Sequence, residues 1–138
     1  MFTKILVPVD LTDKNAGALS VASELAMPHG AEIVLLHVIE TLDVPFDELR
    51  DFYDRLEENA QGRLETLAKP LRDAGIDHSA SIVFGKRAPE IVFHAQNEGC
   101  DLIVISSHKL NPENAEKTWT SISHQVAILA QTPVLVLK

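Results

Sequence analysis

The segment 101–121 holds the residues whose types and order could bind a ligand. It opens with an apolar run over residues 102–105 and continues into Ser106, Ser107, His108 and Lys109. In a parallel sheet, the loop that leaves the carboxyl end of a central strand is where ligands are held. A phosphate-binding loop is rich in glycine, because its backbone amides must approach the anion closely and adopt positive φ. No glycine follows Gly99, so the function depends on whether this loop can hold a phosphate without one.

Two further residues could contact a ligand: one ends the segment, and the other lies outside it and faces it. Ser121 begins the last predicted helix, where its hydroxyl and amide could bind a phosphate. The same position also suits a serine that caps a helix and binds no ligand. Asp10 follows the first apolar run, KILVPV, where it could face a bound ligand. An aspartate at this position is also typical of a cap or turn before a helix. The two interpretations stay open for each residue.

The elements that position these residues are predicted from alternating patterns. Strands are predicted at residues 4–9, 32–38, 78–83, 102–105 and 134–137, with helical patterns between them. This alternation is typical of βαβ units. It predicts one α/β domain over residues 1–138, a doubly wound five-stranded parallel sheet in the order 3-2-1-4-5 with helices on both faces. Asp10 and the loop 106–109 would then face each other at the switch point of the sheet.

Two helices are predicted in more detail. The first should begin at a cap made by Thr12 or Asp13. The longest, over residues 47–73, repeats apolar residues every three or four positions. Its apolar stripe should cover one face of the sheet and consists of Leu49, Tyr53, Leu56, Leu64 and Leu67.

The composition excludes several classes of partner. The 138 residues carry a net charge of −8, which argues against nucleic acid and anionic membranes, because both require basic patches. Cys100 is the only cysteine, so the chain can form no internal disulfide and no thiolate metal cluster. The start, MFTKILVPVD, lacks an apolar leader, and no later apolar run reaches membrane-spanning length. A soluble, cytoplasmic protein is therefore expected.

Several segments together resemble the universal stress protein family over essentially the full length of the chain. They are KILVPVD, LLHVIE, CDLIVISSH and TSISHQVAILAQTPVLVLK. The resemblance implies a Rossmann-like fold. In the ATP-binding members, a Gly-x-x-Gly motif follows strand four, and after nine further residues comes Gly-Ser or Gly-Thr. The resemblance also implies that Asp10 lies near an adenosine and that the backbone of Val38 contacts adenine.

The chain departs from that motif at every glycine. The first glycine falls on Ser106, the second on Lys109 and the third on Thr120, with one extra residue in between, whereas Ser121 keeps the family's identity. The Lys109 side chain disfavours left-handed backbone by roughly 1–2 kcal/mol and occupies space that a phosphate needs. The departures predict a site that does not retain ATP. The alternative is a regulatory module that binds ATP or AMP through a non-standard loop, since the Lys109 amine could bind phosphate as a point charge.

No catalytic or metal-binding constellation is identified in the sequence. Ser107 and His108 are adjacent, but neighbours in an extended segment point apart and rarely form a nucleophile–base pair. The histidines show no metal-ligand spacing, and His37, inside an apolar strand, is interpreted as a hydrogen-bonded core residue. A phosphorelay receiver domain is excluded because no aspartate ends the third strand. The sequence predicts a non-enzymatic stress-response protein without a retained cofactor, with weak ATP or AMP binding left open.

The last strand is predicted to be a dimer interface. It consists of Val134, Leu135, Val136 and Leu137, and the order 3-2-1-4-5 puts it at the edge of the sheet. Monomers normally blunt such an apolar edge with charge, proline or a bulge. Pairing with the same strand of a second copy would satisfy the backbone groups of the edge, and the resemblance implies this arrangement. A homodimer is therefore expected, beside a protein partner that the sequence does not identify.

Overall fold

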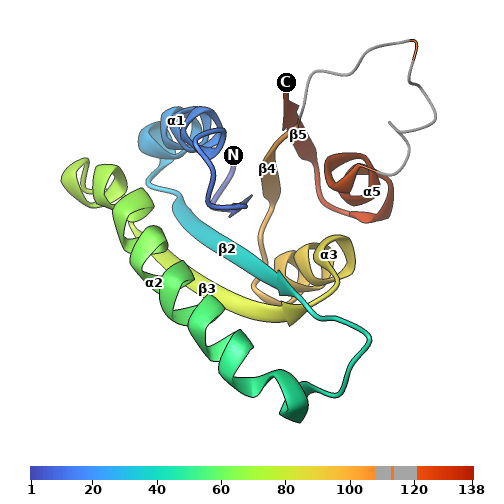
Figure 1. The fold of residues 1–138 in the computed structure, drawn as a ribbon. Helices are drawn as coiled ribbons and strands as arrows, with labels where there is room; N and C mark the ends of the chain where they lie inside the picture. The colour runs from blue at the N-terminus through green and yellow to red at the C-terminus, as the bar shows by residue number, and fades with distance from the viewer. Residues whose placement is uncertain (108–112, 114–120) are drawn as a thin grey trace.

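The structure is a computed structural model of the full chain and describes residues 1–107, 113 and 121–138. Strands and helices alternate along the chain (Figure 1), as predicted. In chain order the elements are β1 (Lys4–Pro8), α1 (Asn15–Ala26), η1 (Met27–His29), β2 (Glu32–Glu40), η2 (Phe46–Leu49), α2 (Arg50–Asp73), β3 (His78–Gly85), α3 (Arg87–Asn97), β4 (Leu102–Ser106), α5 (Ile122–Leu129) and β5 (Val134–Leu137). The strands β2 and β3 run further than their apolar patterns, to Glu40 and Gly85.

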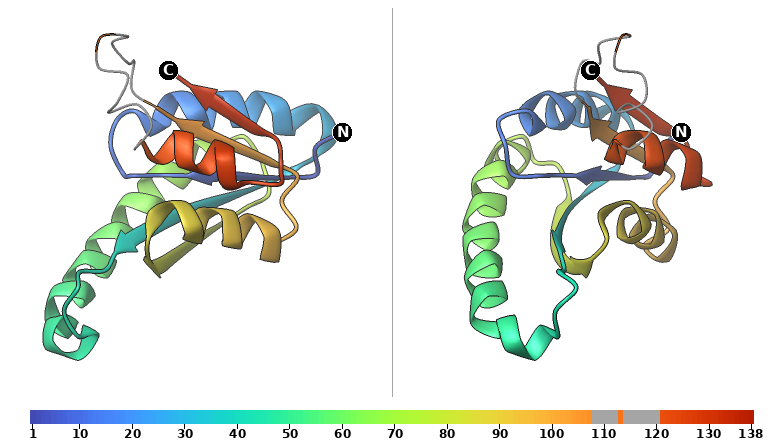
Figure 2. Two further views of the ribbon diagram at one scale, coloured as in Figure 1. Left: turned by 90° about the vertical axis from the view of Figure 1, so that its right-hand side faces the viewer. Right: turned by 45° about the vertical axis from the view of Figure 1, so that its right-hand side comes forward.

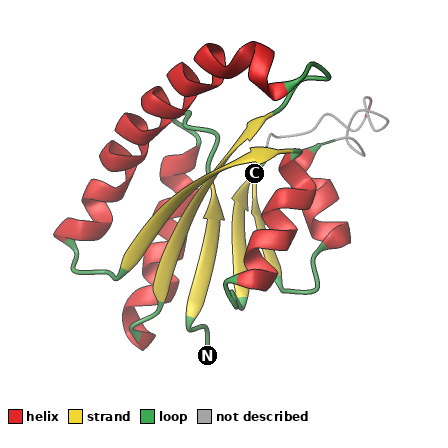
Figure 3. Ribbon diagram, turned by 90° about the horizontal axis from the view of Figure 1, so that it is seen from below, coloured by secondary structure: helices red, strands yellow, loops and turns green. Residues whose placement is uncertain are grey.

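The five strands form one parallel sheet in the order β3-β2-β1-β4-β5. Helices α1 and α2 lie on one face of the sheet, and α3 and α5 lie on the other (Figure 2, Figure 3). The central strand β1 pairs with β2 through Leu6 opposite Val34, and with β4 through Leu6 opposite Ile103. The predicted doubly wound α/β fold is confirmed, and its switch point lies between β1 and β4.

Both faces of the central strands are buried, which explains their continuous apolar runs. Successive side chains of a strand point to opposite faces. Ile5 and Val7 therefore pack in the core with α1 and α2, whereas Leu6 packs in the core with α3 and α5. Cys100 is buried in the second core, as a small apolar residue would be, and burial raises the pKa of its thiol to about 11.

The predicted cap of α1 is wrong. The helix begins at Asn15 after Lys14, which makes no side-chain cap hydrogen bond. Thr12 is engaged elsewhere, because its hydroxyl and its amide both donate to Oδ1 of Asp10, at 2.6 and 3.0 Å. Thr12 therefore belongs to the turn that follows Asp10, and the helix begins after that turn, at Asn15.

The predicted apolar stripe of α2 is only partly correct. Leu56 is 36% exposed, whereas Tyr53 and Leu64 are buried. The row that faces the sheet is Tyr53, Ala60, Leu64, Ala68 and Leu71. Leu56 lies at the edge of this row and is partly exposed, although Tyr53 and Ala60 on either side of it along α2 are buried. Neither α2, with its 24 residues, nor any other helix in the described ranges is long and apolar enough to cross a membrane.

Candidate functional site

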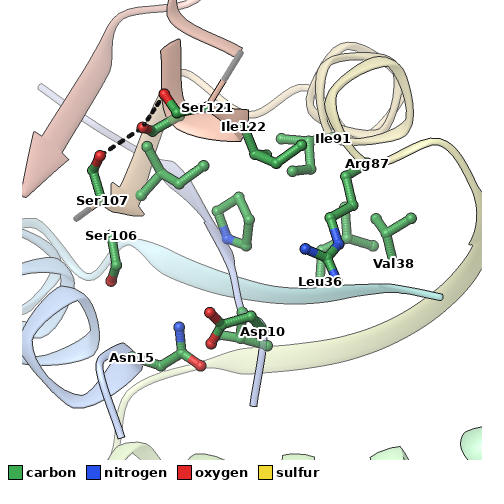
Figure 4. A pocket seen from close by; sticks show the side chains of 14 residues that line it. Asp10, Asn15, Leu36, Val38, Arg87, Ile91, Ser106, Ser107, Ser121 and Ile122 are labelled. Carbon is green, nitrogen blue, oxygen red and sulfur yellow. Dashed lines mark hydrogen bonds between the residues drawn. The ribbon is translucent and has the colours of Figure 1, made fainter. Parts of the chain in front are cut away.

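A cavity of about 290 Å³ lies at the switch point, beside the carboxyl ends of β1, β2 and β4. Asp10, Val38, Ser106 and Ser121, which the sequence singles out, all line it (Figure 4). Lys109 and Thr120 lie outside the described residues. The full lining is Pro8, Val9, Asp10, Asn15, Leu36, Val38, Arg87, Ile91, Ile105, Ser106, Ser107, Ser121, Ile122 and Ser123.

The Asp10 carboxylate is held by a strained turn. Leu11, the next residue, has a φ of 66°, a left-handed conformation that few non-glycine residues adopt. The bonds from Thr12 to Oδ1 of Asp10 stabilise this turn, so Oδ2 is the oxygen that can accept from a ligand. Burial alone would raise the pKa of Asp10, but the Thr12 hydrogen bonds and the nearby Arg87 guanidinium lower the pKa below its ordinary value. Asp10 is therefore an ionised acceptor at neutral pH.

A group of serines forms the opposite side of the cavity. The Ser121 hydroxyl caps α5 by accepting from the His124 amide at 3.3 Å, as the helix start predicted. Ser123 is 5% exposed and donates from its hydroxyl to that of Ser107 at 2.8 Å. Ser106, the last residue of β4, donates to the Lys14 carbonyl at 3.2 Å. Two chain segments, 106–107 and 121–123, thus bring hydroxyl groups together where a phosphate loop was expected.

The remaining wall of the cavity is apolar. It is made by one side of β2 and by residues of α3, β4 and α5, and its members are Leu36, Val38, Ile91, Ile105 and Ile122. Val38 lies beyond Pro8, the last β1 residue that pairs with β2, so β2 continues past its neighbour into the site. An apolar wall, one carboxylate and a set of hydroxyl groups suit a small ligand with a flat apolar part and a polar part.

Sequence reasoning missed Arg87, Asn15 and Ser123 as lining residues. Arg87 comes two residues after the end of β3 at Gly85, and a residue that follows a parallel strand lies at the same sheet edge as Asp10. That position was the available signal. Asn15 and Ser123 are buried within their helices and carried no signal of their own.

The arrangement favours binding over acid–base chemistry. Within the described lining, Asp10 is the only carboxylate, and none of the lining residues is a histidine. His37 lies outside the cavity wall, and its Nδ1 is 2.9 Å from the Val9 carbonyl, as expected for a hydrogen-bonded histidine. Among the residues that the structure describes, no three His, Cys, Asp or Glu side chains are grouped closely enough to hold a metal ion.

The comparison with known proteins agrees with this fold. The model of the universal stress protein family matches residues 1–138. The chain belongs to the universal stress protein family. Universal stress protein YxiE of Bacillus subtilis is 30% identical over 149 residues, with 100% of both chains covered. Universal stress protein MJ0577 of Methanocaldococcus jannaschii is 29% identical over 157 residues, covering 100% of this chain and 96% of MJ0577.

The solved structure of MJ0577 superimposes on this universal stress protein with a TM-score of 0.84, at 31% identity, covering 100% of this chain and 96% of the other. The family expected from the sequence segments is therefore confirmed, together with its Rossmann-like α/β fold.

Proposed function

We propose that this universal stress protein is a non-enzymatic stress-response protein whose cavity binds a nucleoside monophosphate and does not retain ATP. The observation that carries the proposal is the cavity at the switch point. Its volume of about 290 Å³ is at the lower end of the range for ligand sites, roughly 300–1,000 Å³. A ligand with one phosphate suits this volume better than one with three.

The chemistry of the lining matches the three parts of such a ligand. The apolar wall of Leu36, Val38 and Ile91 suits the flat face of a base. Ionised Asp10 can accept hydrogen bonds from ribose hydroxyl groups through Oδ2. The Ser106 hydroxyl can donate to a phosphate by turning away from the Lys14 carbonyl, to which it donates in this structure. Each part of the ligand would thus meet a group of complementary chemistry.

Solved universal stress proteins include one in complex with cAMP and one, from Archaeoglobus fulgidus, in complex with dAMP. Each is 22% identical to this chain, so each likeness shows the shared fold. The proposal for this chain rests on its own cavity.

The absence of an enzymatic role is part of the same proposal. Asp10 is the only carboxylate among the described lining residues, and its lowered pKa makes it a weak general base near neutral pH. The hydroxyl groups of Ser107 and Ser123 bond to each other. The only O–H of Ser123 is therefore engaged with another hydroxyl group and not with a base.

Calorimetric titration with nucleoside monophosphates and with Mg-ATP tests the proposal. We expect at least one monophosphate to bind at one site per chain, with ATP binding no more tightly. Asp10→Ala should weaken monophosphate binding by about tenfold or more, because a charge-assisted hydrogen bond is lost. Asp13→Ala is the matched control, since Asp13 is an exposed aspartate that does not line the cavity. Tight ATP binding, or sustained nucleotide hydrolysis, would overturn the proposal.

The proposal also includes a homodimer formed through Val134, Leu135, Val136 and Leu137. These residues are β5, which lies at one edge of the sheet, beside β4. Leu135 is 37% exposed, and on the neighbouring helix α5 Ile128 and Leu129 are 64% and 51% exposed. Large apolar side chains on an open strand edge support pairing with a second copy.

A further inference from the structure

Arg87 places a cation at one end of the cavity. It is the first residue of α3, and its side chain extends from the helix across the cavity toward Leu36 and Val38 (Figure 4). A second hollow of about 420 Å³ shares Asp10, Val38 and Arg87 with the first. The guanidinium therefore stands between two open volumes, where it can contact whatever fills the first.

The cavity has two chemically different ends. The apolar residues Leu36, Val38 and Ile91 lie at the Arg87 end, and Ser107 and Ser121 lie at the other (Figure 4). Asp10 lies between the two ends in this view. A nucleotide has the same order of parts, with the sugar between base and phosphate. The ligand of the proposed function would therefore lie with its base beside Arg87.

The Arg87 donors are available to such a base. Within the described part of the chain, the guanidinium forms no hydrogen bond and no ion pair of 4 Å or less. Its charge is nevertheless close enough to Asp10 to help lower the pKa of that carboxyl group. A guanidinium carries five N–H donors in a planar fork and no acceptor.

The fork distinguishes purine bases by their exposed edge. Guanine and hypoxanthine present two acceptors side by side, O6 and N7, which a guanidinium can bind with two parallel hydrogen bonds. Adenine presents N7 beside the N6 amino group, which is a donor and cannot accept from arginine. We propose that Arg87 reads the base, so that this cavity prefers 6-oxopurine nucleotides over adenine nucleotides. The inference rests on the nucleotide binding proposed above and names the class of base.

Titration of the full chain with GMP, IMP and AMP tests the preference. The three ligands share ribose and phosphate and differ only in the base. We expect GMP and IMP to bind about tenfold or more tightly than AMP. Equal affinities, or a preference for AMP, would overturn this inference and leave the proposed function standing. Failure of all the monophosphates to bind would overturn the proposed function and this inference with it.

Variants of Arg87 identify the source of the preference. Arg87→Met keeps the length of the side chain and removes its donors, whereas Arg87→Lys keeps the charge and loses the fork. Arg87→Met should bring the affinities for GMP and AMP to within about threefold of each other, whereas Arg87→Lys should keep only part of the preference, because an ammonium still donates to O6 and N7. Arg55→Met is the matched control, because Arg55 is an exposed arginine of α2 that does not line either hollow. Arg87 is itself exposed, so thermal melting should show its variants folded. A full preference retained by either Arg87 variant would overturn the proposed role of the fork.

Discussion

The Asp101 carboxylate shows how a single residue can join distant parts of this chain. It accepts hydrogen bonds from the Thr3 amide and hydroxyl, at 2.8 and 3.0 Å, and from the Lys4 amide at 3.1 Å. Burial alone would raise the pKa of Asp101, but these bonds lower it below its ordinary value. The unfolded chain therefore binds more protons than the folded chain in acid. The stability that Asp101 contributes is complete above the unfolded pKa, about 3.9, and is lost as the pH falls through the lower folded pKa.

Asp101→Asn should accordingly lower the free energy of unfolding at pH 7 by on the order of 1 kcal/mol. The difference from the unsubstituted chain should shrink once the pH falls below the unfolded pKa, about 3.9, and should vanish below the lower folded pKa of Asp101. Urea titrations at several pH values measure it. Asp54→Asn, at an exposed carboxylate of α2, is the control and should change little at any pH. A difference that stayed constant from pH 7 to strong acid would contradict the assigned role of ionised Asp101.

At the scale of elements, two leucines of α2 that share the predicted apolar stripe differ in their burial. Leu64 is 4% exposed and belongs to the core with α1, whereas Leu56 is 36% exposed. Leu64→Ala should cost about 2–5 kcal/mol of stability, because it leaves a cavity in a packed core. Leu56→Ala should cost less than about 1 kcal/mol, as at other exposed positions. Chemical denaturation of the two variants measures both costs, and equal costs would contradict the orientation of α2.

At the scale of the whole molecule, the β5 edge decides the expected assembly. Sedimentation equilibrium of the intact chain should give a dimer at roughly 20 μM. Leu135→Lys should shift the monomer–dimer equilibrium toward the monomer by placing a charge in the apolar interface. Leu135 is the better position for this test than Val136, because Val136 packs against the core with α3 and α5. Met27→Lys is the control, since Met27 is 60% exposed in η1, away from β5. A monomer at that concentration, or a Leu135→Lys dimer of unchanged stability, would refute pairing through β5.

The sequence by itself determined the fold and the place of the site. Four apolar runs without alternation are typical of strands buried on both faces, and residues 78–83 alternate as an edge strand does. Five strands separated by helices predict a parallel, doubly wound sheet. Once that topology is set, the carboxyl ends of neighbouring strands must meet at one edge. For this reason Asp10 and Ser106 could be assigned to one place from the topology, and the family resemblance added Val38 and Ser121. The structure brings all four around one cavity.

Only the tertiary structure decided which side chains face that cavity and how far each helix is covered. Periodicity shows which residues recur along one side of α2, but not which part of that side turns toward the sheet, so Leu56 could not be distinguished from Leu64. Tyr53 is buried because Phe46 stacks on it at 4.9 Å and the Leu42 amide donates to its hydroxyl at 2.9 Å. Arg87 and Asp10 are distant in sequence. The packing of α3 against the sheet brings the Arg87 guanidinium to the cavity, near Asp10.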